Sequence, residues 1–239
     1  MLVFAGHPKA SLVWHQYVYG EIFRKLALKV NYATRLINAK RYLEQNPCNF
    51  LFYKSASYKQ IQDDWIGFHV YRDPRDMLIS GYFSSKFSHP AEKHPKLQKQ
   101  RAQLLKLPLD LGLMLEMDYL DEHFQEMFGW DLNDNRFLTI SMEKLFSSEK
   151  NTFLFNQQVI KHLGWEGYIT NNYLESLLEK YSFKNLTNRN KGDTDKTHHF
   201  RNGLPEDWKN YFTPEVKEEF KYRYGEILIE YNYEKSNDW

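Results

Sequence analysis

The sequence lacks several features that would place it in whole classes of protein. It has a single cysteine, Cys48, among 239 residues, so no disulfide can form within the chain. Its 32 basic side chains balance 31 acidic ones, which excludes a general electrostatic attraction to nucleic acid or to an acidic membrane surface. No apolar run approaches the roughly 20 residues that a membrane helix needs. We therefore expect no nucleic-acid partner and no membrane partner, and any bound anion must be captured by a local site.

The start of the chain also lacks the pattern of a secretory leader, in which a charged segment precedes an apolar run and a small-residue cleavage site. Together with the lone cysteine, this predicts a cytoplasmic protein. A length of 239 residues suits one α/β domain, so we expect a single domain over residues 1–239. No internal repeat, low-complexity segment or spacing that would indicate an oligomeric state is evident.

What the sequence does contain is a series of short apolar runs separated by longer amphipathic segments. The runs are typical of buried parallel strands and cover residues 2–6, 49–53, 66–71 and 136–141. Apolar residues recur at helical spacing in residues 33–45, 76–83, 113–128 and 151–163. Near the end, Thr213 can cap a helix that has Pro214 at its first position and runs to about Tyr231. This alternation predicts an α/β fold with a central parallel sheet flanked by helices.

Two polar segments interrupt this pattern. Residues 84–106 carry one acidic side chain, Glu92, against a basic set of Lys86, Lys93, Lys96, Lys99, Arg101 and Lys106. We interpret this segment as a surface excursion, more typical of a solvated helix face than of a basic lid over a second substrate. Residues 187–199 lack apolar periodicity and predict a loop that could close over a ligand.

Three segments carry residues suited to binding an anion. The first is His7-Pro8-Lys9, where the first strand turns into a helix. Backbone N–H groups of residues 10–13 and the Lys9 ammonium could meet a phosphate or sulfate there. Taken alone, the segment is more typical of an ordinary turn, because it lacks the glycines and the Lys-Ser/Thr ending of an ATP-binding P-loop.

The second segment leaves a strand at Arg72 and enters a helix that contains Ser80. A guanidinium and a hydroxyl at this spacing can converge on one phosphate, although Arg72 could equally pair with Asp73 or Asp76 on the surface. The third segment begins with Arg201-Asn202-Gly203, where a glycine permits a close backbone approach beside an arginine. Without further context, this third segment reads as a plain loop before an amphipathic turn.

Taken together and in this order, the three segments resemble the donor-binding elements of the cytosolic sulfotransferase family, which uses 3′-phosphoadenosine 5′-phosphosulfate (PAPS). Residues 8–14, PKASLVW, resemble the family's phosphosulfate loop, Pro-Lys-Ser-Gly-Thr-Thr-Trp. Arg72 with Ser80 resembles the element that holds the 3′-phosphate. Residues 201–213 resemble the C-terminal signature Arg-Lys-Gly-x-x-Gly-x-Trp-Lys-Asn-x-Phe-Thr, and residues 181–183 resemble the segment against the adenine.

The resemblance implies a Rossmann-like P-loop fold, with PAPS as donor substrate and 3′-phosphoadenosine 5′-phosphate (PAP) as product. It implies sulfonate transfer to a hydroxyl or amine of a small-molecule acceptor, by in-line displacement without a metal. Lys9 and Lys54 are then expected to neutralise the transferring group and the departing phosphate. The donor-binding residues that it implies are Lys9, Ala10, Ser11, Leu12, Val13, Trp14, Arg72, Ser80, Tyr181, Phe183, Arg201, Asn202 and Gly203.

The sequence departs from the family pattern at several of these positions. In the loop, a glycine and two threonines are replaced by Ser11, Leu12 and Val13, and the adenine-side tyrosine by Met142. In Tyr53-Lys54-Ser55-Ala56, aligned with the family's Lys-Thr-His, the last residue replaces the general-base histidine. The candidate replacements are His7, His15, Asp63 and Asp64, while His69 is expected to belong to the sheet.

Three functions follow from these observations. The first is an active sulfotransferase, for which a phenol or an amine as acceptor would need no strong base. The second is a catalytically inactive relative that binds PAPS or PAP. The third, a P-loop kinase of small molecules, conflicts with the missing Gly-Lys-Ser/Thr ending and the lack of a clear magnesium ligand. No motif identifies the acceptor.

Overall fold

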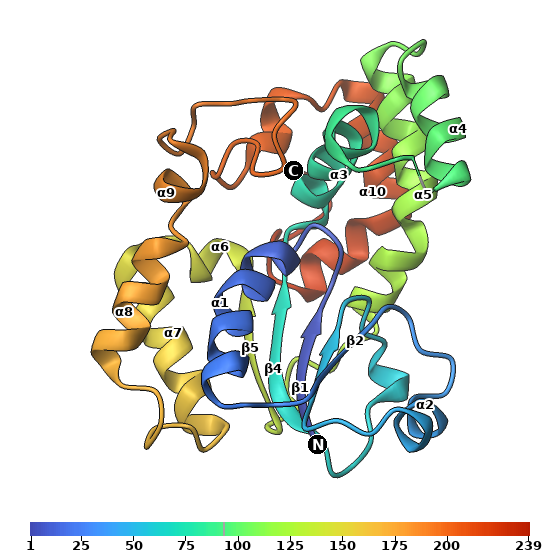
Figure 1. Cartoon of the computed structure of the whole chain (residues 1–239). Helices are drawn as coiled ribbons and strands as arrows, with labels where there is room; N and C mark the ends of the chain where they lie inside the picture. The colour runs from blue at the N-terminus through green and yellow to red at the C-terminus, as the bar shows by residue number, and fades with distance from the viewer. Residues whose placement is uncertain (93) are drawn as a thin grey trace. The chain divides into compact units, whose positions relative to one another are not determined.

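The computed structural model describes residues 1–92 and 94–239, so Lys93 of the expected basic segment lies outside the described residues. The chain divides into two compact units, each built from two stretches of sequence (Figure 1). The first, here the sheet unit, contains Met1–Arg72 and Gln125–Leu186. The second, here the helical unit, contains Asp73–Phe124 and Thr187–Trp239. The single domain expected from chain length stays a prediction.

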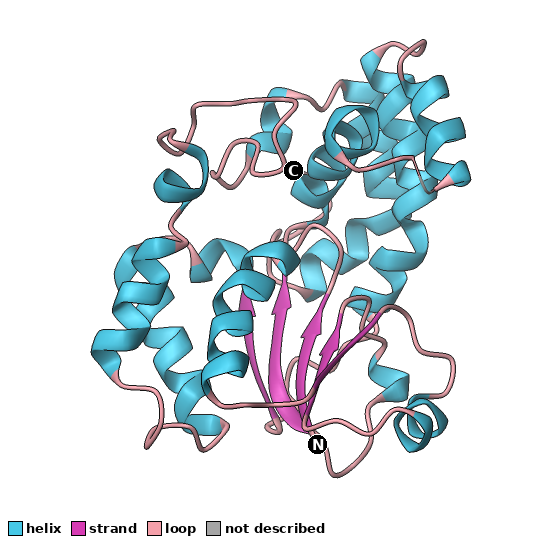
Figure 2. Cartoon of the chain, viewed as in Figure 1, coloured by secondary structure: helices cyan, strands magenta, loops and turns pink. Residues whose placement is uncertain are grey.

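Within the described residues, the sheet unit contains one parallel five-stranded sheet in the order β2-β3-β1-β4-β5 (Figure 2). Its strands are β1 (Leu2–Gly6), β2 (Val30–Ala33), β3 (Phe50–Tyr53), β4 (Ile66–Tyr71) and β5 (Phe137–Ser141). The first strand is central, and its Phe4 lies opposite Phe52 of β3 and Phe68 of β4. The predicted parallel sheet is therefore confirmed, with four of its strands at or within a residue of their expected bounds.

The strand β2 was not predicted, and the helix expected over residues 33–45 starts too early. Ala33 ends β2, and the helix α2 covers only Ala39–Gln45. The Asn38 side chain accepts a hydrogen bond from the Arg41 backbone N–H and so caps this helix at its true start. An edge strand that is only partly buried has no strong apolar run, which explains why its sequence did not indicate it.

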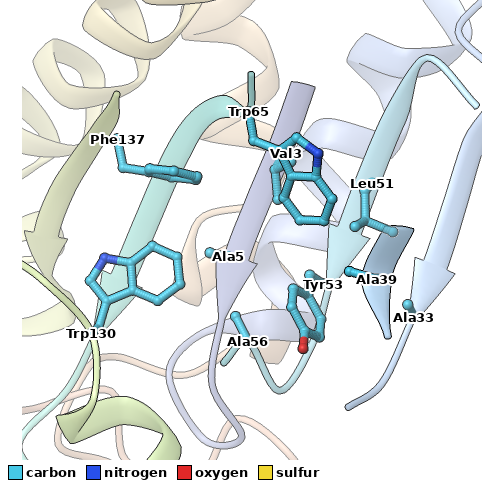
Figure 3. Packing of buried hydrophobic residues seen from close by; sticks show 10 residues of the cluster. All are labelled: Val3, Ala5, Ala33, Ala39, Leu51, Tyr53, Ala56, Trp65, Trp130 and Phe137. Carbon is cyan, nitrogen blue, oxygen red and sulfur yellow. The ribbon is translucent and has the colours of Figure 1, made fainter. Parts of the chain in front are cut away.

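Side chains alternate between the two faces of the sheet, and each face has its own aromatic core. On one face, Val3 and Ala5 of β1 pack in a cluster with Trp65 and Trp130 (Figure 3). On the other face the Phe4 ring lies 4.5 Å from Phe52 and 4.8 Å from Phe68, measured between centroids. The high aromatic content thus serves two buried layers of packing.

The remaining helices of the sheet unit lie between its strands or follow the last strand. The long helix α1 (Leu12–Lys25) lies against the Phe4 face through its buried Tyr19, whose ring is 4.7 Å from Phe68. The other elements are η1 (Tyr58–Gln60), α6 (Met142–Leu145), α7 (Glu149–His162), α8 (Asn171–Lys180) and α9 (Phe183–Thr187). Ser141, Ser148 and Thr170 cap α6, α7 and α8 through their side-chain oxygens.

The helical unit is built around α3 (Pro74–Phe83) and two longer helices. Its elements are α3, η2 (Ser84–Ser88), α4 (Pro95–Leu104), α5 (Leu109–Phe128), η3 (Asp207–Asn210) and α10 (Pro214–Glu230). Thr213 accepts a hydrogen bond from the Val216 N–H and caps α10, as expected. The exposed Lys96 and Lys99 of α4 agree with the interpretation of this segment as a solvated helix face. Over residues 1–92 and 94–239, no helix combines the length and apolar character needed to cross a membrane.

Gly67 of β4 gives the clearest test of the sheet. A Cβ atom at this position would overlap the backbone carbonyl oxygen of Val3 in the neighbouring strand. We expect Gly67→Ala to lower the free energy of unfolding by about 2 kcal/mol or more, because overpacking against backbone cannot relax through a rotamer change. Urea unfolding followed by circular dichroism measures this.

The matched control is Gly20→Ala in the interior of α1, where a Cβ would meet no atom of the described residues within 4 Å. This substitution should leave stability unchanged or raise it by about 0.5 to 1 kcal/mol, because alanine favours a helix more than glycine does. Equal stability of both variants would contradict the close pairing of β1 with β4.

Candidate functional site

The ends of three parallel strands meet at one edge of the sheet. Because β1 lies between β3 and β4, the segments that leave these strands start side by side. The Ala56 backbone N–H donates to the Gly6 carbonyl over 3.1 Å. The Arg72 guanidinium donates from Nη1 to the Lys9 carbonyl over 2.9 Å. The sheet unit thus brings together Lys9, Arg72 and the segment around Ala56.

The loop after β1 keeps a tight conformation without its expected glycine. Lys9 and Ser11 both have positive φ, at 67° and 58°, in the left-handed region that favours glycine. Ser11 stays there because its Oγ donates to the Ala10 carbonyl over 2.7 Å. The Ala10 N–H was predicted to face an anion, but it donates to the His7 carbonyl over 3.1 Å and is used inside the turn.

The start of α1 remains suited to an anion. Among the described residues, Ser11 makes no side-chain capping hydrogen bond to this helix. The first N–H groups of a helix have no acceptor inside it, and the helix dipole adds partial positive charge there. Leu12 packs over the strand end, with its Cδ2 only 2.5 Å from where a Cβ on Gly6 would stand. The contribution predicted for Leu12 is therefore that of its backbone N–H group.

The buried side chain of His15 contacts the loop after β1. Its ring is fully buried and stacks 4.7 Å from the Phe4 ring, and its Nδ1 lies 3.0 Å from the Ser11 carbonyl oxygen. Burial lowers the pKa of His15 to about 4, against a weaker opposing effect of the hydrogen bond to Ser11. His15 is therefore neutral at pH 7, with Nδ1 donating to that carbonyl. It packs inside the protein, and the base role expected for it stays a prediction.

A second buried pair lies at the same edge of the sheet. The Nε2 atoms of His7 and His69 are 2.9 Å apart, and both residues have 0% exposure. Burial, together with the charge of His7, holds the pKa of His69 well below its usual value, and Trp130 stacks 4.2 Å from the His69 ring. One nitrogen must donate while the other accepts. His69 belongs to β4, as predicted, and the base role of His7 stays a prediction.

Ala56 leaves no room for the histidine that the family has at this place. Its exposure is 0%, and it belongs to the cluster that contains Ala5, Tyr53 and Trp130 (Figure 3). Lys54 lies two residues earlier, and its ammonium is 5.6 Å from the centroid of the Tyr32 ring on β2. In this structure the Lys54 side chain therefore extends over the edge strand, on the side of β3 away from β1.

The residues expected near the adenine lie where α1 meets the end of α8. The Trp14 indole donates from Nε1 to the Tyr181 carbonyl over 2.9 Å. The Tyr181 hydroxyl donates to Glu21 over 2.8 Å, and its ring stacks on Tyr17 at 5.6 Å. Phe183 begins the short helix α9 close by in sequence. The structure brings Trp14 and Tyr181 together, and it fixes Tyr181 through contacts of both its backbone and its ring.

In the helical unit, the predicted Arg201 is the most distinctive residue. It is only 8% exposed, its Nη2 pairs with Asp207, and its guanidinium carbon lies 4.8 Å from the Phe83 ring centroid. Within the described part of the chain, its Nε and Nη1 atoms are buried without a hydrogen-bond partner. Buried donors without acceptors are costly. An anion at this place would satisfy both.

The neighbours of Arg201 hold its segment in shape. Gly203 has a φ of 79°, which explains why glycine stands there, and the Asn202 side chain accepts from the Leu204 N–H over 3.0 Å. Asn202 thus supports the turn through its own side chain. The predicted Ser80 lies elsewhere in the sequence, on α3, and is partly exposed.

Two buried acids that were not predicted as site residues position this segment. Asp76 of α3 accepts backbone N–H groups of Glu206 and Trp208, over 2.8 and 3.0 Å. Asp207, between them, pairs with Arg201. Asp73 accepts from Arg75, whose guanidinium lies 4.1 Å from the Trp208 ring. The signal that could have revealed Asp207 is a charged residue directly before a tryptophan in a segment with few other acids.

A family profile described as "Sulfotransferase domain" matches residues 68–232. The chain belongs to this sulfotransferase family. The matched residues include Arg72, Ser80, Tyr181 and Arg201. Lys9, Lys54 and Ala56 lie before the matched region. That earlier part of the chain is where the sequence departs most from the family pattern.

Two curated relatives align with much of the chain. The sequence is 27% identical to a guinea pig (Cavia porcellus) 3-beta-hydroxysteroid sulfotransferase over 169 residues, which cover 67% of this chain and 55% of that one. It is 28% identical to Cytosolic sulfotransferase 16 of Arabidopsis thaliana over 168 residues, which cover 62% of this chain and 46% of that one. The chain therefore spans about half the length of the curated relatives it matches.

Solved structures with the same fold include mouse sulfotransferase SULT7A1 complexed with PAP, at a TM-score of 0.57 and 16% identity. That match covers 95% of this chain and 84% of the other. Retinol dehydratase in complex with retinol and PAP matches at a TM-score of 0.55 and 15% identity, covering 95% and 80%. The sheet order and these likenesses agree on the predicted P-loop-type α/β fold.

The burial of Ala56 predicts that restoring the family's residue is harmful. We expect Ala56→His to lower the free energy of unfolding by about 1 to 3 kcal/mol, because the added ring enters a filled core next to Trp130. Ala56→Ser, which adds one atom, is the smaller companion change. Thermal unfolding compares the two, and a fully stable Ala56→His variant would contradict the packing described for this position.

Proposed function

We propose that the chain transfers a sulfonate group from PAPS to a hydroxyl or amine of a small-molecule acceptor and releases PAP. The observation that carries this proposal is the buried Arg201 guanidinium, whose Nε and Nη1 atoms lack partners among the residues described. Membership of the sulfotransferase family and the PAP named in the mouse relative's structure support the same donor. The lone Cys48 and a plant relative named as cytosolic support the cytoplasm as the compartment.

Each unit has its own candidate donor-binding groups. In the sheet unit these are the Lys9 ammonium, the first N–H groups of α1 and Arg72, while Trp14, Tyr181 and Phe183 are the proposed adenine contacts. Arg72 has a second task, because its hydrogen bond to the Lys9 carbonyl holds the loop in place. In the helical unit the proposed groups are Ser80, Arg201 and the backbone around Asn202 and Gly203.

The proposed reaction is a single displacement at sulfur. The acceptor oxygen or nitrogen forms a bond to sulfur while the bond from sulfur to the bridging phosphate oxygen breaks. The electron pair of that bond leaves with PAP, so negative charge grows on its 5′-phosphate. Lys9 is the proposed group that neutralises this charge, since positioned cations lower the energy of such a transition state. Lys54 is the second candidate, and reaching the donor requires its ammonium to leave the Tyr32 ring.

The acceptor also loses a proton, and Ala56 cannot take it. Residue 7 follows Gly6, whose carbonyl accepts from the Ala56 N–H, so His7 is the proposed replacement at this end of the sheet. Its Nε2 contacts the Nε2 of His69, whose lowered pKa makes His69 a weak base for an added proton. Because both rings are buried, we propose acceptors that need little help from a base, namely phenols and amines, ahead of aliphatic alcohols.

Donor binding is tested without knowing the acceptor. Wild-type protein should bind PAP in the micromolar range by calorimetry, and Arg72→Ala and Arg201→Ala should each weaken binding by about 1.5 kcal/mol or more, the scale of a hydrogen bond to a charged group. Arg223→Ala, which removes an arginine paired with Asp118 on the surface of α10, is the control and should bind as wild type does.

ATP serves as the comparison ligand and is titrated by the same method. PAP that fails to bind, or that binds no better than ATP and is unaffected by both arginine substitutions, would overturn the donor assignment. Magnesium-dependent binding of ATP would instead favour a kinase.

Turnover separates an active enzyme from a relative that only binds the donor. With PAPS and a panel of phenols, amines and aliphatic alcohols, wild-type protein should form sulfonated products. Lys9→Ala should slow this turnover by a factor on the order of 100 or more. Mass spectrometry of the products measures the rates. If no acceptor in the panel is sulfonated while PAP binds, the inactive alternative replaces this proposal.

A further inference from the structure

The loop at residues 187–199 is attached to the segment that carries Arg201. The Gly192 N–H donates to the Asn202 carbonyl over 2.8 Å, and the Asp195 N–H donates to the Arg201 carbonyl over 3.0 Å. The Arg189 guanidinium donates to the Arg201 and Phe200 carbonyls over 2.9 and 2.6 Å. The loop follows α9 in Figure 1. Its position is fixed by these hydrogen bonds to the segment that carries Arg201, and we call residues 187–199 the arm.

This arm places a second cation beside the ring that contacts Arg201. The Lys196 ammonium lies 5.7 Å from the centroid of the Phe83 ring, and the Arg201 guanidinium carbon lies 4.8 Å from the same centroid. Lys196 is exposed, and it forms no ion pair with any residue in the described ranges. Asp207 balances only one of these two positive charges.

The residue after Phe83 has a further unsatisfied polar atom. Ser84 directly follows Phe83, is 7% exposed, and has an Oγ that is buried without a partner in the part of the chain described. Two cations at one ring repel each other, and two buried Arg201 nitrogens lack acceptors among the described residues. A dianion such as a phosphate would remove both penalties, since charge-assisted hydrogen bonds to phosphate are strong.

We propose that Lys196 is a second cation of the anion site formed by Arg201, and that it binds a phosphate group of the donor nucleotide. This proposal rests on the proposed function and extends it to a residue outside the family's signature. Lysine supplies a mobile point charge with three donors, whereas Arg201 supplies a fixed planar set. The phenyl ring of Phe83 holds the ammonium near the site before the ligand arrives.

The test uses the full chain, PAP, and the two mononucleotides that each carry one of its phosphates, adenosine 3′-monophosphate and adenosine 5′-monophosphate. Lys196→Ala should raise the Kd of PAP about tenfold, while Lys196→Arg, which keeps the charge, should stay within about threefold of wild type. Lys196→Ala should also weaken binding of only one mononucleotide, which identifies the phosphate that Lys196 meets. Calorimetry measures each Kd, and raised salt should shrink the difference.

The matched control is Lys191→Ala, an exposed lysine five residues earlier in the same loop. It removes the same charge and should bind PAP as wild type does. Lys196→Ala that binds PAP like wild type, or Lys191→Ala that weakens PAP as much, overturns the role of Lys196 alone. Wild-type protein that does not bind PAP overturns the proposed function as well.

Discussion

The pairing of β1 with β3 on one side and with β4 on the other determines the geometry of the sheet unit. Parallel strands end at one edge, so three segments far apart in sequence leave from the same place. The hydrogen bond from Arg72 to the Lys9 carbonyl, and that from Ala56 to the Gly6 carbonyl, follow from this arrangement. Close strand approach at Gly67 is a condition for the pairing of β1 with β4, which brings Arg72 to the Lys9 carbonyl.

The helical unit depends on a different constraint, which is the burial of charge. Arg75 and Asp73, like Arg201 and Asp207, are paired in places with little access to water. Such pairs add little net stability compared with apolar packing, but breaking one partner leaves an uncompensated charge. Asp76 contributes differently, by accepting two backbone N–H groups of the segment that carries Asp207. The cost of these charges is consistent with a segment shaped for binding an anion.

Much of the fold could be predicted from sequence, because buried strands and capped helices have strong local patterns. The strand at residues 66–71 and the helix after Thr213 are examples. The edge strand β2 could not be predicted, since its side chains are only partly buried. The sequence indicated which residues are candidates for the site, but not their backbone conformations or side-chain contacts. Nothing in a serine indicates a left-handed φ at residue 11, nothing in Lys54 indicates its direction over Tyr32, and Lys196 acquires a role only through the distant Phe83.

Gly6 and Leu12 show how the loop and the strand constrain each other's evolution. The Leu12 side chain occupies the space that any side chain at residue 6 would need. The Phe4 ring meets the same place, with two of its atoms 2.7 and 2.8 Å away. A larger residue at position 6 therefore requires both Leu12 and Phe4 to give way, so position 6 is epistatic with both. Where the family has threonine, this chain has leucine, and that side chain adds to the constraint on residue 6. Among homologues that vary in this loop, a residue larger than glycine at position 6 should come with changes at both other positions.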